Sequence, residues 1–192
     1  MSCVTPVVLA AALVTTLPLV VRVYDAVSVP SEPLERAHVT VEQTLTAVGI
    51  RPIWRLCRAD LCADPPGRDE VIVRIVKAGE RGSRDLLGSS MVDVEGQAGT
   101  LATIYLDRVE ALAGQAQVDS GRLLGHTIAH EIAHLLLGTA SHTHAGLMRA
   151  RWLTPELQRD WPLDWRLSAP EGARMRWRLL VRAAASRSAR AD

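Results

Sequence analysis

Short runs of β-branched and other apolar residues occupy the first half of the chain, whereas apolar residues at helical spacing dominate the second half. Short runs of this kind, bounded by turn-forming residues, predict strands. Apolar positions three or four residues apart predict helices with one buried face. The pattern predicts five strands, at residues 19–24, 50–56, 71–76, 89–94 and 101–106.

One helix is predicted between the first two strands, at residues 31–48, with Gly49 after its end. The remaining helices are predicted at residues 107–113, at 120–137, from Thr154 onward, and at 171–184. An order of strand, helix and strand, followed by more strands and then helices, predicts an α+β domain with a mixed sheet.

The last of these helices is basic and amphipathic. One face carries four apolar residues, Trp177, Leu180, Val181 and Ala184. The opposite face carries three arginines, Arg174, Arg178 and Arg182. A basic amphipathic helix can lie on a membrane surface. We expect instead that the apolar face docks on the domain and that the arginines stay in solvent.

The chain begins with an apolar segment, residues 4–21, which is too short and too interrupted to be a transmembrane helix. Small residues at positions 10–12 fit a signal-peptidase site, although no Lys or Arg precedes the apolar run. We expect residues 1–18 to be a signal peptide or apolar leader and residues 19–185 to form a single domain. A disordered tail is expected at residues 186–192.

Composition and cysteine content narrow the class of protein. The 192 residues are 48% hydrophobic and 22% charged, a composition typical of one globular domain. The net charge of +1 gives the chain no overall electrostatic attraction to nucleic acid. Loss of Cys3 with the leader would leave Cys57 and Cys62, which can form a disulfide in an oxidising compartment. We therefore expect a secreted or periplasmic protein, with a cytoplasmic location as the alternative.

The candidate chemistry lies in the helix predicted at residues 120–137. His130 and His134 are four residues apart, so both imidazoles can face one metal ion. Glu131 projects about 100° around the helix from His130, so it need not be a ligand and can accept a proton from a metal-activated water. The HExxH pattern, set among apolar residues at helical spacing, is typical of a catalytic zinc site.

A catalytic zinc takes three protein ligands and keeps one open position. Gly138 can end the helix in a left-handed turn, which brings both His142 and His144 within reach of the ion. Glu156 is a third candidate, although it also suits the first turn of a helix that starts at Thr154. His126 lies two turns from His134, too far for all three helical histidines to bind one ion, so we expect it to be a packing residue.

The segment HEIAHLLLG, followed by Ser-His and then by Gly-Leu-Met, resembles the metzincin clan of zinc peptidases, and the matrixin-like members most. The resemblance covers residues 125–152. It implies zinc ligands His130, His134 and His142, the general base Glu131, the helix-breaking Gly138 and the Met-turn residue Met148. The clan usually places the glycine three and the third histidine six residues after the second histidine, whereas the offsets here are four and eight.

The resemblance also implies a fold, in which a twisted mixed sheet carries two long helices and the active-site helix is followed by a small C-terminal helical subdomain. Residues 19–185 would then be a metallopeptidase-like catalytic domain. The ligand set departs from the clan's usual spacing, so His144 and Glu156 stay open as alternatives to His142.

The expected function is hydrolysis of peptide bonds by zinc-activated water, with Glu131 as general base and one catalytic Zn²⁺. A peptide or protein substrate would lie extended along an edge strand at residues 89–94. The alternatives are a non-catalytic zinc-binding scaffold protein of the same fold and a gluzincin-like peptidase with Glu156 as third ligand. We expect no nucleic-acid partner and no stable membrane insertion, and the sequence predicts no oligomeric state.

Overall fold

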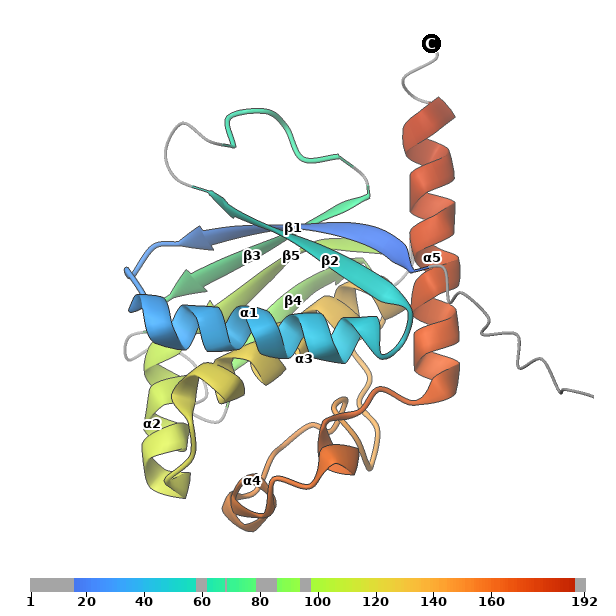
Figure 1. Cartoon of the computed structure of the whole chain (residues 1–192). Helices are drawn as coiled ribbons and strands as arrows, with labels where there is room; N and C mark the ends of the chain where they lie inside the picture. Colours follow the sequence, from blue (N-terminus) through green and yellow to red (C-terminus); the bar gives the residue numbers. More distant parts are fainter. Residues whose placement is uncertain (1–15, 58–61, 68, 79–85, 94–97, 189–192) are drawn as a thin grey trace, which may run out of the picture.

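The computed structural model of the chain describes residues 16–57, 62–67, 69–78, 86–93 and 98–188 (Figure 1). The expected leader therefore lies outside the described residues up to position 15. The strands are β1 (Leu17–Asp25), β2 (Ile50–Cys57), β3 (Glu70–Val76), β4 (Gly88–Asp93) and β5 (Ala98–Tyr105). The helices are α1 (Ser31–Thr46), α2 (Leu106–Ala116), α3 (Ser120–Leu137), α4 (Thr154–Arg159), the 3₁₀ helix η1 (Pro162–Trp165) and α5 (Ala169–Ser188).

The strands form one mixed sheet in the order β2-β1-β3-β5-β4. β1 pairs in parallel with β2 and β3, and β3 pairs in parallel with β5. Only β4, at one edge of this sheet, runs antiparallel to its neighbour β5. The predicted α+β fold with a twisted mixed sheet is confirmed, as is the presence of all five predicted strands.

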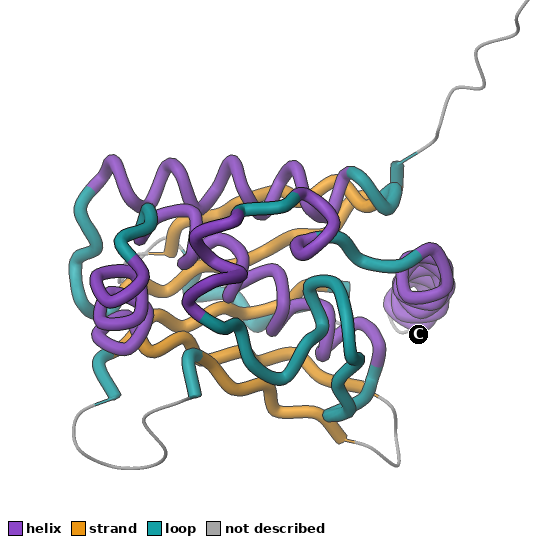
Figure 2. Tube along the Cα trace, turned by 90° about the horizontal axis from the view of Figure 1, so that it is seen from below, coloured by secondary structure: helices purple, strands orange, loops and turns teal. Residues whose placement is uncertain are grey.

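The two long helices α1 and α3 lie side by side against one face of the sheet (Figures 1 and 2). Their close approach depends on Gly125, where an added Cβ would stand 2.5 Å from Thr40 Cβ and 2.7 Å from the Ala37 carbonyl oxygen. The helices and the inner face of the sheet share one core, which includes Leu19, Val21, Val73, Ile75, Leu124, Ile128 and Ile132. Burial of this apolar surface is the main source of the fold's stability.

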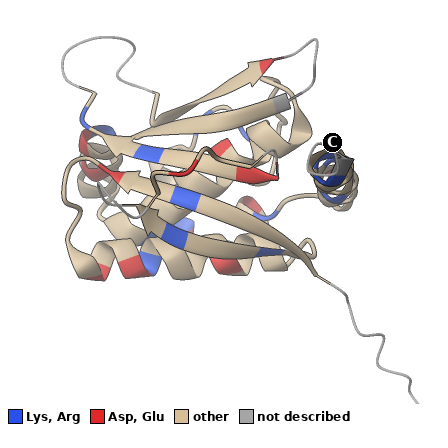
Figure 3. Ribbon diagram, turned by 90° about the horizontal axis from the view of Figure 1, so that it is seen from above, with Lys and Arg blue, Asp and Glu red and all other residues tan. Residues whose placement is uncertain are grey.

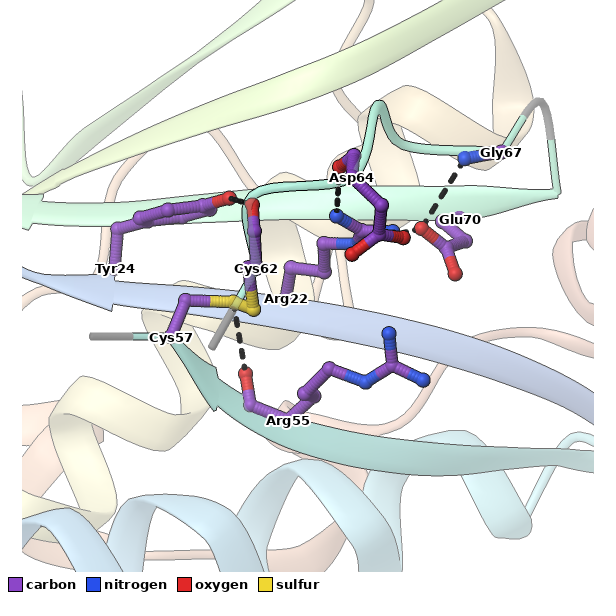
Figure 4. The surroundings of a disulfide bond; sticks show 8 residues. All are labelled: Arg22, Tyr24, Arg55, Cys57, Cys62, Asp64, Gly67 and Glu70. Atoms are coloured by element: carbon purple, nitrogen blue, oxygen red, sulfur yellow. Dashed lines mark hydrogen bonds and ion pairs between the residues drawn. A yellow bond between two sulfur atoms is a disulfide. The ribbon is translucent and has the colours of Figure 1, made fainter. Parts of the chain in front are cut away.

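The opposite face of the sheet carries basic positions along its strands (Figure 3). Arg22 of β1 points to this face and is only 1% exposed. Its guanidinium pairs with Asp64 at 2.7 Å and with Glu70 at 2.6 Å (Figure 4), which compensates a buried charge. A disulfide joins Cys57 and Cys62, so the cysteine pair expected from the sequence is present.

Helix α5 packs in a different orientation from the one we predicted. Its buried face is formed by Met175 and Leu179, whereas Trp177, Leu180 and Val181 are exposed. The prediction that this apolar face docks on the domain was therefore wrong. The helix stands beside one end of the sheet (Figure 1), and two of its arginines take part in the docking: Arg176 donates to the Val48 carbonyl and Arg182 donates to the Leu135 carbonyl, both at 2.6 Å.

The ends of the folded region differ slightly from the expected boundaries. β1 begins at Leu17, within the segment expected to be a leader, and α5 continues to Ser188, into the expected tail. In the described part of the chain, no helix combines the length and apolar content needed to cross a membrane.

Candidate metal centre

Helix α3 carries the HExxH residues and begins and ends where its sequence predicts. Asp119 caps the start, because its carboxylate accepts a 2.7 Å hydrogen bond from the backbone N–H of Arg122. Gly138 ends the helix with φ of 63°, in the left-handed region that favours glycine. Its N–H still donates to the His134 carbonyl, and the chain then turns back past the last helical turn.

Three histidines converge at this turn. The Nε2 atoms of His130 and His134 lie 3.0 Å apart, and those of His134 and His142 lie 3.3 Å apart. In the described residues these three form a group able to hold a metal ion, with one ligand atom from each within 4.8 Å of the others. His144 is exposed and is not part of this group.

The other ring nitrogens of the two helical histidines fix their tautomers. His130 Nδ1 is 2.9 Å from the Leu147 carbonyl oxygen, and His134 Nδ1 is 2.8 Å from the Thr139 carbonyl oxygen. A carbonyl oxygen only accepts, so both Nδ1 atoms donate and both Nε2 atoms of the neutral rings present lone pairs. This arrangement orients histidine ligands in metal sites.

The converging ring nitrogens are better placed to bind a cation than to hydrogen-bond to one another. Burial lowers the pKa of His130 to about 4, and burial also lowers the pKa of His134, so both rings are neutral at neutral pH. Two lone pairs would then face each other at 3.0 Å. Tetrahedral zinc with Zn–N bonds of about 2.0–2.1 Å separates its ligand nitrogens by about 3.3 Å, so the observed spacing suits a zinc ion.

A tight loop brings the Leu147 carbonyl to His130. Gly146 has φ of 76°, and a Cβ at this position would stand 2.6 Å from the Arg166 carbonyl oxygen. That same oxygen accepts from the N–H of Leu147 at 2.9 Å. Met148, the residue predicted for the Met turn, is buried in the core and its carbonyl accepts from Thr143 N–H at 2.8 Å. The loop thus joins the metal-centre histidines to the core.

Glu131 lies beside the three histidines and is held by strand β4. Its side chain is buried, and Ser90 Oγ donates to its carboxylate at 2.5 Å. Burial raises the pKa of Glu131 to about 7, while the hydrogen bond from Ser90 acts in the opposite direction. Gly88 leaves room for this carboxylate, since a Cβ there would stand 2.8 Å from Glu131 Oε1.

Sequence reasoning did not find Ser90, Gly88 or the Leu147 carbonyl. Ser90 contacts Glu131 across 41 residues and Leu147 contacts His130 across 17 residues, so both contacts depend on the tertiary fold. The small residues Gly88 and Ser90, at the start of the predicted edge strand, are the one feature of the sequence that could have indicated these contacts.

A cleft of about 760 Å³ opens beside the histidines. Its lining includes Gly88, His130, Glu131, His142 and Trp152. The Trp152 ring meets His130 edge-on at 5.7 Å between ring centroids. The cleft therefore gives an extended ligand access to both the histidine cluster and the Glu131 carboxylate.

Two other candidates have structural roles. His126 stacks on Trp165 at 4.1 Å and is buried, in agreement with the expected packing role. Glu156 accepts from the backbone N–H of Leu153 at 2.9 Å and pairs with Arg149 at 2.6 Å. It thus stabilises the start of α4 and is not part of the histidine group.

Comparison with known proteins gives a likeness at the level of fold. No protein-family model matches the chain, and no curated protein matches it. Among solved structures, archaemetzincin from Methanopyrus kandleri matches with a TM-score of 0.53 and 12% sequence identity, covering 86% of this chain and 97% of its own. At that identity the likeness shows the fold alone, and the chain has a metzincin-like fold. The matrixin-like features inferred from the sequence stay a prediction.

Proposed function

We propose that the protein is a zinc-dependent endopeptidase. The observation that carries this proposal is the convergence of three histidine Nε2 atoms beside the buried carboxylate of Glu131. The archaemetzincin-like fold supports the same reaction class, because the metzincins that the sequence motif resembles are zinc peptidases.

His130, His134 and His142 would hold the zinc through Nε2. Three protein ligands leave a coordination position open for water or substrate, as in catalytic zinc sites. When bound, zinc supplies Lewis acidity, which activates water and polarises the scissile carbonyl. The Leu147 and Thr139 carbonyls keep the two helical imidazoles in the ligand tautomer.

Glu131 would act as the general base and then as the general acid. Its carboxylate accepts a proton from the attacking water and passes that proton to the leaving amine. A pKa raised by burial to about 7 suits both roles near neutral pH. Ser90 holds the carboxylate in place throughout, through its hydrogen bond from β4.

The substrate would bind as an added strand along β4. This strand is the sheet edge nearest the histidines, since Ser90 contacts Glu131 and Gly88 lines the cleft. An edge strand offers free backbone groups that recognise an extended peptide whatever its side chains. The exposed side chain of Met91 would contribute apolar contact on the same strand.

An oxidising compartment is the proposed location, either outside the cell or in the periplasm. The disulfide between Cys57 and Cys62 supports it, because disulfides persist mainly in such compartments. Mass spectrometry of protein from the native host, without reduction, tests this location through the linked peptide.

A peptide library tests the function. Zinc-loaded protein should cleave internal peptide bonds, and Glu131→Gln should lower kcat by at least about a thousandfold while zinc content stays at the parent level. His134→Ala should lose zinc as well as activity. Zinc retention without cleavage of any peptide would favour a non-catalytic zinc-binding scaffold, and cleavage by Glu131→Gln at the parent rate would contradict the mechanism.

A further inference from the structure

Helix α5 presents an apolar stripe to solvent. The stripe, here called the outer face, consists of Ala173, Trp177, Leu180, Val181 and Ala184. Trp177 is 58% exposed, Leu180 52% and Val181 49%. Residues at this spacing lie on one side of a helix, so their exposed surfaces are contiguous. The opposite side, with Met175 and Leu179, already packs on the domain. The side chains of Trp177, Leu180 and Val181 on the outer face are therefore accessible to a partner.

Basic residues border the outer face on both sides. Arg174 and Arg187 are exposed and lie at its two edges on the helix. Arg178 lies over the Trp177 ring at 5.4 Å. Glu171, in the first turn, is the single acidic residue of α5, and its carboxylate accepts from the Ser168 N–H. The partner that this surface fits is therefore both apolar and anionic.

This charge pattern disfavours a second copy of the chain. Two outer faces packed on each other would bring the exposed arginines of one helix against those of the other. Without acidic residues on this part of the helix, their repulsion would have no compensation.

The amino-terminal apolar sequence joins the domain beside the same helix. Leu17, the first residue of β1, donates its N–H to the Gly49 carbonyl at 2.9 Å. Arg176 of α5 reaches the same turn, where it donates to the Val48 carbonyl at 2.6 Å. Residues 4–16 are almost wholly apolar or hydroxyl-bearing and lead directly into Leu17. Where the leader is retained, an apolar sequence therefore enters the domain at the end where α5 docks, which favours a membrane surface over a protein as the partner.

We propose that the outer face of α5 binds the surface of an anionic membrane, with the helix lying in the headgroup region. Trp177, Leu180 and Val181 would enter the boundary between headgroups and acyl chains, as in interfacial amphipathic helices. Arg174 and Arg187 would pair with lipid phosphates at the edges of the stripe. No insertion across the bilayer is involved, in line with the absence of a spanning helix among the described residues. The binding would hold the peptidase cleft near membrane-associated substrates.

Sedimentation with lipid vesicles tests the proposal on the full chain. The parent should bind vesicles that contain phosphatidylglycerol with phosphatidylcholine and bind pure phosphatidylcholine much less, and added salt should weaken the binding. Trp177→Ala and Leu180→Glu should each lower the partition coefficient by roughly tenfold. Arg174→Gln should lower it roughly fivefold. All three positions are exposed, so thermal unfolding should be unchanged and serves as the folding check.

Trp161 provides the matched control. It is 52% exposed and lies beside an arginine, Arg159, at 5.4 Å, but it belongs to the segment between α4 and η1. Trp161→Ala should bind vesicles like the parent. Equal binding by the parent and the α5 variants would overturn the proposal and assign the binding to another segment. No vesicle binding by the parent, or a dimer in sedimentation equilibrium that Trp177→Ala abolishes, would also overturn it.

Discussion

The hydroxyl of Ser90 donates a 2.5 Å hydrogen bond to the carboxylate of Glu131, which ties the proposed general base to the edge strand of the sheet. The strand proposed to bind substrate therefore also positions the group that moves the proton. Ser90 acts through Glu131, so its effect should appear in turnover more than in binding.

Ser90→Ala should lower kcat by roughly tenfold, the effect of losing one hydrogen bond to a charged group. KM and zinc content should stay close to parent values, since the hydroxyl is directed at the Glu131 carboxylate and Ser90 is not one of the three histidine ligands. Ser90→Thr retains the hydroxyl and should restore most of the turnover. Ser89→Ala is the control, because Ser89 points to the other face of β4, toward Tyr105. Equal losses for Ser89→Ala and Ser90→Ala would contradict a positioning role.

Gly125→Ala should destabilise the fold by about 1–3 kcal/mol, the usual cost of overpacking a core. The new methyl group would meet Thr40 Cβ at 2.5 Å and the Ala37 carbonyl at 2.7 Å, so α1 and α3 would have to separate. Gly114→Ala in α2 meets nothing within 4 Å and should stabilise by about 0.4–1 kcal/mol. Urea unfolding of the two variants measures both changes. A stable Gly125→Ala protein would show that the two helices are not packed so closely.

His126 should make the protein less stable in acid. Burial lowers its pKa from the ordinary value of 6.5 to about 4, with a smaller contribution from the charge of Arg122 that Asp160 opposes. As pH falls below 6.5 the unfolded chain binds the proton first, so folding stability falls until the pH reaches about 4. At about 1.4 kcal/mol for each pH unit between the two pKa values, the loss is at most roughly 3 kcal/mol.

His126→Phe removes this titration and retains a ring against Trp165. The difference in unfolding free energy between parent and variant should change between pH 7 and pH 4, with the variant gaining relative to the parent. His130 and His134 are common to both proteins, so their titration cancels in the difference. A difference that is constant over this range would mean that His126 is not held in its neutral form.

The sequence predicted α3 in full because several independent signals agree there. Apolar spacing, a residue able to cap the start at position 119 or 120 and a glycine at position 138 all point to the same helix, and the HExxH spacing then places two imidazoles on one face. The sequence also left three candidates for the third metal ligand. The choice among His142, His144 and Glu156 depends on how the loop after Gly138 folds, and only the structure provides that path.

Helix α5 shows where sequence periodicity stops being informative. The spacing of Trp177, Leu180 and Val181 correctly put them on one face, but Met175 and Leu179 form a second apolar face. Periodicity does not decide which of two apolar faces meets the domain. In the structure Met175 and Leu179 are buried, and in the same orientation Arg176 and Arg182 donate hydrogen bonds to the Val48 and Leu135 carbonyls. The side of a helix that carries arginines is thus not always the side that faces solvent.

Zinc content per chain tests the central claim most directly. Purified protein reconstituted with zinc and freed of excess metal should carry about one zinc ion, as expected for one three-histidine site. His142→Ala should lose it, because that side chain closes the triad with His130 and His134, whereas His144→Ala should retain it. A parent protein that binds no zinc, or equal retention by both variants, would contradict the metal centre and with it the proposed peptidase.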